Sequence, residues 1–559
     1  MFKFFYAFLG SLGFLLVNFS CQQAPDGQKN IQQSANSHQE MVNMLAEVNQ
    51  KYRHYQNNFC AEAKIAHYDS ILRTAQNMDL GAVINAKLRR AEALLQYGDE
   101  LKAIEQYRDL FQYKSKLSIQ SQIDLFNSLA VAYLRLGERT NCINNHSEDA
   151  CVLPIRGSGI HKDQSGSREA IKIFQSILKS FPNELSSRWL LNLAYMTLGE
   201  YPEKVPADFL IPGLDAESEY KIKPFEDISA YVGMNLDNIA GGVIADDFDN
   251  DDYIDIVTTT WSLDEPMHYF KNNGDGTFTD RSQESGLGVL KGGLNMVTAD
   301  YNNDGFVDFF ILRGAWQGQK GFGEQPNSLI KNNGDGTFTD VTATTGVLTF
   351  RPTQTATWND FNRDGWVDLF VGNETTEANQ PYPCELYMNN QDGTFTDRAL
   401  SAGVAYDENG LARAGMGVSI ADLDNRGSKS IAIGNFSGEP VSLYTQMGME
   451  TFLDRAGATR LSKPTTTALT FGLLFADFNL DGFEDLILAN GHIEPEIEHI
   501  RETWEFAQRP QLFLNNRSGQ FVEVTDRAGS PFGSKIVGRS VATADVDGDG
   551  DLDVLLTAN

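Results

Sequence analysis

Short apolar runs on either side of an acidic turn recur through the second half of the chain. The last copy, VATADVDGDGDLDVLLTAN, covers residues 541–559. Its flanking runs are rich in valine, leucine and alanine and are bounded by turn residues, which is typical of buried β-strands. In the turn itself, aspartates occupy positions 1, 3, 5 and 9. The pattern therefore predicts a β-hairpin whose tip gathers several carboxylates.

Five well-formed copies of this acidic turn, and one weak copy, lie between residues 247 and 559. Oxygen ligands at alternate positions of a tight turn converge on one point, which suits a hard cation such as Ca²⁺. We therefore predict about five Ca²⁺ sites. Their ligands are Asp247, Asp249, Asp251, Asp255, Asp300, Asn302, Asp304, Asp308, Asp360, Asn362, Asp364, Asp368, Asp477, Asn479, Asp481, Asp485, Asp545, Asp547, Asp549 and Asp553. The weak copy has Arg426 and Ser430 at positions 5 and 9, so we predict that it binds no ion; the guanidinium of Arg426 could itself fill the site by bonding Asp422 and Asp424.

A second motif alternates with the acidic turn. It reads FKNNGDGTFTD at 270–280, IKNNGDGTFTD at 330–340, YMNNQDGTFTD at 387–397 and FLNNRSGQFVE at 513–523. Asn-Gly and Asp-Gly turns between apolar runs are hairpin signals. Each period of roughly sixty residues therefore holds about four strands, which is the content of one β-propeller blade. Six repeat units are recognisable, and seven blades are possible.

These motifs resemble the FG-GAP or VCBS-type repeats of integrin-α-like propellers. Together with ANGHI at 489–493, they are similar to bacterial relatives of cartilage acidic protein, in which such repeats often precede an ASPIC/UnbV segment. The resemblance covers roughly residues 223–559, and the chain stops where the ASPIC/UnbV segment would begin. It implies an exported calcium-binding β-propeller, and it implies no particular reaction.

Residues 38–205 follow a helical pattern instead. The segment LRRAEALLQYGDELKAIEQYRDLF at 88–111 places small and apolar residues at the spacing of a tetratricopeptide (TPR) repeat. The segments 125–138 and 168–184 resemble the two helices of another unit. A plain helical bundle would show the same periodicity. In either case we predict a helical scaffold that binds a protein partner.

The remaining segments define the domain boundaries. Residues 1–21 read as a signal peptide with a lipobox, so we predict lipidation at Cys21, with plain export as the alternative. A flexible tether at 22–37 follows, and a linker at 206–222 separates the helices from the propeller at 223–559. An insertion at 141–167 carries Cys142 and Cys151, for which we predict a disulfide.

The charge of the chain restricts its partners. A net charge of −30 argues against a nucleic-acid partner, because phosphate binding needs an excess of lysine and arginine. We expect an exported protein of the bacterial cell envelope, either an outer-membrane lipoprotein or a periplasmic or cell-surface protein. We expect contact with a membrane only through the lipid anchor.

The long, dissimilar segments 313–327, 372–385 and 490–510 should lie on the face opposite the acidic turns. Variable loops on a rigid scaffold are where binding sites are usually built. Candidate ligand-binding residues there are Trp316, Tyr382, His492 and Trp504, although the same aromatic side chains could simply cover the core. We predict a binding or adhesion protein that recognises a glycan or protein ligand, and no enzyme. The alternative is an exported polysaccharide-active enzyme built on the same propeller.

Overall fold

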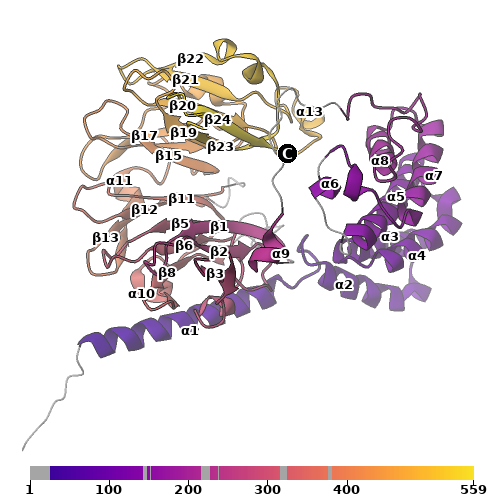
Figure 1. The fold of residues 1–559 in the computed structure, drawn as a ribbon, viewed down its shortest axis with the longest axis horizontal. Helices are drawn as coiled ribbons and strands as arrows, with labels where there is room; N and C mark the ends of the chain where they lie inside the picture. Colours follow the sequence, from indigo (N-terminus) through magenta and orange to yellow (C-terminus); the bar gives the residue numbers. More distant parts are fainter. Residues whose placement is uncertain are drawn as a thin grey trace, which may run out of the picture.

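The computed structural model describes residues 26–142, 148–151, 153–215, 227–236, 238–314, 324–375 and 381–559. N-terminal helices are followed by a β-rich region (Figure 1), which confirms the predicted order of the two halves. Cys21, Trp316 and the side chains of Cys142 and Cys151 lie outside the described residues. Within the part that is described, every helix is too short or too polar to cross a membrane.

Helices α2 to α8 form a body beside the sheets (Figure 1). They are α2 (Ala61–Arg73), α3 (Leu80–Tyr97), α4 (Glu100–Leu110), α5 (Ile119–Cys142), the short α6 (Glu148–Cys151), α7 (Ser165–Ser180) and α8 (Leu185–Met196). Each long helix packs against the next long helix along the chain. Ala91 and Ala103, two of the small residues in the TPR-like pattern, are fully buried. Small side chains at these contacts allow the helices to approach closely.

Helix α1 (Asp26–Tyr52) packs on the short helix α10 (Thr342–Thr345) and on strands of the β-rich region instead of on the body formed by α2 to α8, which the sequence did not predict. The expected tether at 22–37 is helical from Asp26, and residues 38–52 leave the helical body to which they were assigned. His38 Nδ1 accepts a hydrogen bond of 3.0 Å from the backbone N–H of Asp340, and Leu45 is buried among the residues of the first two sheets. An amphipathic pattern predicts a buried face but not which surface covers it.

Among the described residues, seven antiparallel sheets are present: a small one formed by β7 (Gln325–Pro326) and β10 (Phe350–Arg351), and six, here called sheets I to VI, that follow one another along the chain. Sheet I contains β1 (Ala240–Asp246), β2 (Asp255–Thr260), β3 (His268–Asn272) and β4 (Phe278–Asp280). Sheet II contains β5 (Asn295–Ala299), β6 (Asp308–Leu312), β8 (Ser328–Asn332) and β9 (Phe338–Asp340). Sheet III contains β11 (Thr353–Asn359), β12 (Asp368–Asn373), β13 (Glu385–Asn389) and β14 (Phe395–Asp397). Sheet IV contains β15 (Gly417–Ala421), β16 (Ser430–Gly434), β17 (Ser442–Gln446) and β18 (Phe452–Asp454). Sheet V contains β19 (Thr470–Ala476), β20 (Asp485–Asn490), β21 (Gln511–Asn515) and β22 (Phe521–Glu523). Sheet VI contains β23 (Gly538–Ala544) and β24 (Asp553–Ala558).

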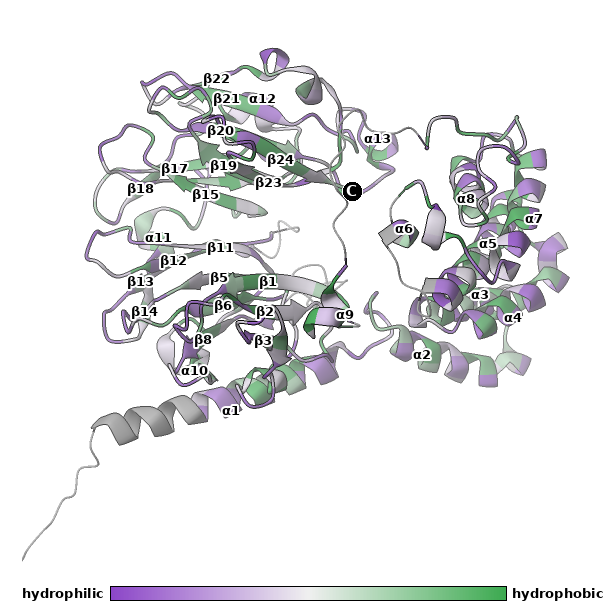
Figure 2. Ribbon diagram, viewed as in Figure 1, coloured by the Kyte–Doolittle hydropathy of each residue, from purple (hydrophilic) through white to green (hydrophobic). Residues whose placement is uncertain are grey.

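Each acidic turn joins the first and second strands of its sheet, and each Asn-Asn turn joins the third and fourth strands. Both kinds of turn therefore lie on one face, as predicted, and the long connections lie on the other. The second strands β6, β12, β16 and β20 are buried along their whole length, because both faces of an inner sheet are covered. Figure 2 shows hydrophobic residues along the strands, for example in β19, β20 and β24.

Successive sheets pack through their first strands, from β1 against β5 to β19 against β23. No comparable packing joins β23 to β1 among the strands that the structure describes, so the sheets form an open series. The closed propeller that the sequence predicted is not seen in this part of the chain. Sheet VI also has only two described strands, and Leu555 on β24 is 67% exposed.

In sheets II to V, the first amide side chain of the turn between the third and fourth strands connects neighbouring sheets; in sheet IV, which lacks the Asn-Asn pair, this residue is Gln446. Its side-chain nitrogen donates to a backbone carbonyl at position 2 of the acidic turn in the preceding sheet. The bonds run from Asn332 to Phe248 (2.7 Å), from Asn389 to Tyr301 (2.8 Å), from Gln446 to Phe361 (2.7 Å) and from Asn515 to Leu423 (2.9 Å). From the sequence, the motif predicts only a turn. The structure shows that its first side chain also holds two neighbouring sheets together.

Candidate metal loops and the opposite face

The first aspartate closes each acidic turn, here numbered loops I to VI after their sheets. In loop III, Asp360 accepts hydrogen bonds from the backbone N–H groups of Asp364 (3.1 Å) and Gly365 (2.9 Å). The same pair of bonds is present in all six loops. These bonds hold the backbone of positions 5 and 6 against the first aspartate in every loop.

The donor atoms of the loops suit a hard divalent cation. Carboxylate oxygens of Asp247, Asp249 and Asp251 lie within 4.8 Å of one another, and so do those of Asp545, Asp547 and Asp553 in loop VI. An ion with Ca–O distances of about 2.3–2.6 Å can bridge oxygens at that separation. Loops II, III and V have asparagine at position 3, which supplies an amide oxygen in place of one carboxylate. In loops I and VI, three of the four predicted ligand residues therefore come together.

The aspartate at position 9 is more deeply buried than the others. Asp368 accepts the backbone N–H of Asn389 at 2.8 Å and that of Phe361 at 3.0 Å, so it ties the loop to the second and third strands. Burial raises the pKa of Asp308 to about 8, that of Asp368 to about 7 and that of Asp485 to about 6. A bound cation would favour the charged forms of these carboxylates. Position 9 is thus both a structural and a candidate ligand residue.

The side chain at position 4 connects each loop to the next. Asn250 donates to the carbonyl of Gly305 (3.0 Å), and Asn303 donates to that of Gly365 (3.2 Å). Arg363 and Asn425 make the equivalent bonds to Gly427 and Gly482. Position 4 adopts a positive φ, which asparagine tolerates better than most residues. In loop V this position is Leu480, which is 62% exposed and has no side-chain donor, so the series of bonds ends there.

Lysine and arginine side chains already contact some of the acidic loops. Lys271 Nζ lies 2.6 Å from Asp249 and 2.5 Å from Asp251, inside loop I. Burial opposes its charge, but hydrogen bonds to these two aspartates raise the pKa of Lys271 above its usual range. Lys331 lies 3.1 Å from Asp304 in loop II. The motif alone does not predict these contacts, but it contains a signal for them. The residue before the Asn-Asn pair is lysine in two repeats and methionine or leucine in two others.

The weak loop IV differs from the prediction in one respect. Arg426 does not fill the loop, because its side chain is 82% exposed and its Nε lies 3.9 Å from Asp424. The guanidinium therefore stays in solvent instead of bonding both aspartates. With arginine at position 5 and Ser430 at position 9, the loop still lacks two of the four acidic ligands.

The predicted aromatic residues lie on the opposite face in different environments. The Tyr382 hydroxyl donates to Glu324 Oε1 at 2.7 Å, so the connections of sheets II and III meet there. His492 is 2% exposed, and its ring lies between Phe436 and Trp504 at centroid distances of 5.4 and 5.9 Å. Burial lowers the pKa of His492. Its surroundings are those of a packed side chain, whereas Trp504 is only partly covered.

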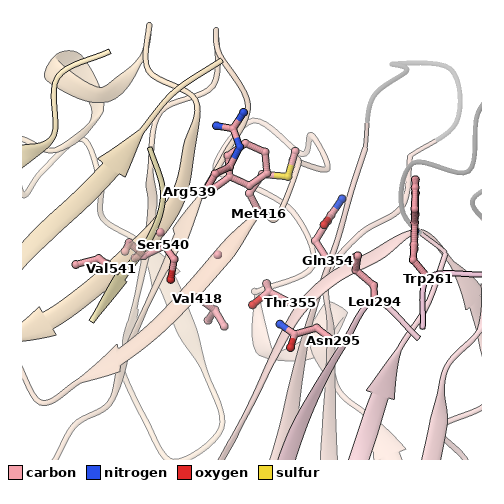
Figure 3. A pocket seen from close by; sticks show the side chains of 14 residues that line it. Trp261, Leu294, Asn295, Gln354, Thr355, Met416, Val418, Arg539, Ser540 and Val541 are labelled. Carbon is pink, nitrogen blue, oxygen red and sulfur yellow. The ribbon is translucent and has the colours of Figure 1, made fainter. Parts of the chain in front are cut away.

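The sheets and their long connections enclose two cavities that could hold a ligand. A cavity of about 480 Å³ is lined by the first strands of sheets II to VI, and Figure 3 shows Arg539 and Met416 across it from Gln354, Leu294 and Trp261. A second cavity, of about 310 Å³, is lined mostly by polar residues around the long connection of sheet V. Sequence reasoning did not find Arg539, because only the assembled sheets bring it to the shared cavity.

Comparison with known proteins defines the class of the β-rich region. Residues 247–311, 319–371, 360–433 and 504–556 match the model of the FG-GAP-like repeat. The chain therefore contains FG-GAP-like repeats, as its motifs predicted.

Among curated proteins, the chain is similar to cartilage acidic protein 1. It is 29% identical to the Xenopus tropicalis protein over 216 residues, which cover 37% of this chain and 30% of that protein. It is 26% identical to the Homo sapiens protein over 287 residues, which cover 49% of this chain and 38% of that protein. The matched regions thus span less than half the length of these relatives.

Proposed function

We propose that the protein is an exported, calcium-binding β-propeller protein of the bacterial cell envelope that recognises a glycan or protein ligand. In this proposal the acidic loops hold about five Ca²⁺ ions that stabilise the sheets. The opposite face and the central cavity bind the ligand, and the TPR-like helices dock a protein partner. A lipid at Cys21 anchors the protein to the membrane.

The observation that carries the proposal is the repeated loop geometry. Six loops use the same hydrogen bonds to hold their first aspartate, and in loops I and VI three carboxylates lie within 4.8 Å of one another. Carboxylates held this close repel one another, so a divalent cation should contribute strongly to the stability of the native state. Near-identical loops suit a structural ion, whereas the dissimilar connections opposite them suit a specific ligand.

Thermal melting in excess Ca²⁺ and in a chelator tests the calcium part of the proposal. The full chain should melt at a higher temperature with Ca²⁺. The D364N variant in loop III should show a smaller shift, whereas the matched D424N variant in the weak loop IV should keep the wild-type shift. Identical melting curves for the wild-type protein with Ca²⁺ and with chelator would refute the calcium role.

Ligand recognition is tested by a glycan array and by pull-down of envelope proteins with the calcium-loaded chain. A captured ligand should lose affinity by about 1–3 kcal/mol with W504A if Trp504 is an anchor on the opposite face. Cleavage of an arrayed glycan would instead favour the alternative, a polysaccharide-active enzyme.

A further inference from the structure

The acidic loops are not equally free to receive a cation. In loop I the Lys271 ammonium lies 2.6 Å from Asp249, 2.5 Å from Asp251 and 3.9 Å from Asp255. Three of the four predicted ligands thus surround a positive charge that belongs to the chain. In loop V, Arg517 Nε lies 3.0 Å from Asp481, so this loop also carries a cation.

Loop III has no such cation at the equivalent place. Met388 occupies the position of Lys271, since Lys271 pairs with Thr279 and Met388 pairs with Thr396 in the same register of their hairpins. From that hairpin, the neutral Gln391 side chain contacts Asp364, to which its amide donates a hydrogen bond of 2.9 Å. Across the described residues, no lysine or arginine forms an ion pair with an aspartate of loop III.

We infer that the residue before the Asn-Asn pair sets the calcium affinity of loops I, II and III, with Lys271 acting as a tethered competitor in loop I. Loop III, which has Met388 there, then binds Ca²⁺ more tightly than loop I. This inference rests on the proposed calcium function and concerns which loops fill first.

Electrostatics sets the size of the effect. A unit positive charge about 4 Å from a divalent ion repels it enough, even at the dielectric constant of water, to weaken binding about thirtyfold. If the lysine instead swings into solvent, it loses its contacts with the aspartates, so calcium binding is weakened by that route as well.

Terbium luminescence can test this prediction at loop III alone. Tb³⁺ replaces Ca²⁺ and emits when a nearby tryptophan is excited. Of the six loops, loop III is the one with a tryptophan at position 7, Trp366. The W366F variant, which copies the phenylalanine of loops II and V, should lose most of this signal and so confirm the assignment. M388K should weaken Tb³⁺ binding about thirtyfold. The uncharged control M388Q should bind within about threefold of wild type, because it alters polarity without adding charge.

The reverse substitution tests loop I without disturbing the core. K271M should tighten one Ca²⁺ site by about thirtyfold in a calorimetric titration of the full chain. If the wild-type chain binds Tb³⁺ but neither K271M nor M388K changes the affinity for the metal ion, the inference is wrong. It is also wrong if M388Q weakens Tb³⁺ binding as much as M388K does. Absence of any Tb³⁺ signal and of any calorimetric heat from the wild-type chain would instead refute the calcium function itself.

Discussion

Replacing Asn389 with alanine should destabilise the β-rich region far more than the same change at Asn272. The Asn389 amide donates to the carbonyl of Tyr301 in sheet II at 2.8 Å and to that of Val367 at 3.1 Å. Asn389 is only 5% exposed, so water cannot easily replace these bonds. Its Oδ1 also accepts the backbone N–H of Gln391 at 2.9 Å.

The expected loss follows from the number of buried partners. Each buried polar group left without a hydrogen bond costs about 1–3 kcal/mol, so two carbonyls give about 2–4 kcal/mol after partial relaxation. Asn272 is the matched control, because it occupies the same motif in sheet I. Its amide donates to the exposed Ile254 carbonyl at 2.9 Å and to no preceding sheet, so N272A should cost about 0.5–1 kcal/mol.

Equilibrium unfolding in urea, followed by tryptophan fluorescence, measures both values in the calcium-loaded full chain. The N389A variant should unfold at a clearly lower urea concentration than N272A. Equal losses for the two variants would show that the bond to the preceding sheet contributes little and that the motif acts only as a turn.

Two further predictions concern pH and loop IV. Burial lowers the pKa of His38, and its Nδ1 accepts a backbone N–H, so the docking of α1 should be stable above about pH 6.5 and weaken as pH falls below that value. Proteolytic cleavage of α1 should therefore accelerate from pH 7.5 to pH 5.5 in wild type but much less in H38Q, and equal acceleration in both would exclude His38 as the cause. The double variant R426D/S430D completes the four acidic positions of loop IV and should add one bound Ca²⁺ per chain in equilibrium dialysis, whereas an unchanged stoichiometry would show that more than these ligands was missing.

Local patterns in the sequence predicted much of the β-rich region. The acidic turns, the Asn-Asn turns and their common face all depend on residues close together in the chain, and the structure confirms them. The bond from Asn389 to Tyr301 spans 88 residues, and no local pattern reveals such a partner. The contact of Lys271 with loop I likewise requires the third strand to fold back beside the first turn. Helix α1 was assigned to the wrong body because its apolar stripe suits a helix or a sheet equally well.

The hydrogen bonds that join neighbouring loops stop at Leu480, and this affects which sheet unfolds first. Loops I to V are joined side by side, but loop VI is not joined to loop V by a position-4 side chain, and β24 exposes Leu555. Sheet VI should therefore open as a unit at a lower free energy than the sheets before it. In a deuterium-exchange experiment its amides would be labelled first, while those of the fully buried strands β6 and β12 would be labelled last. A segment that opens while its neighbours stay folded is also the place where another β-strand can most easily be added.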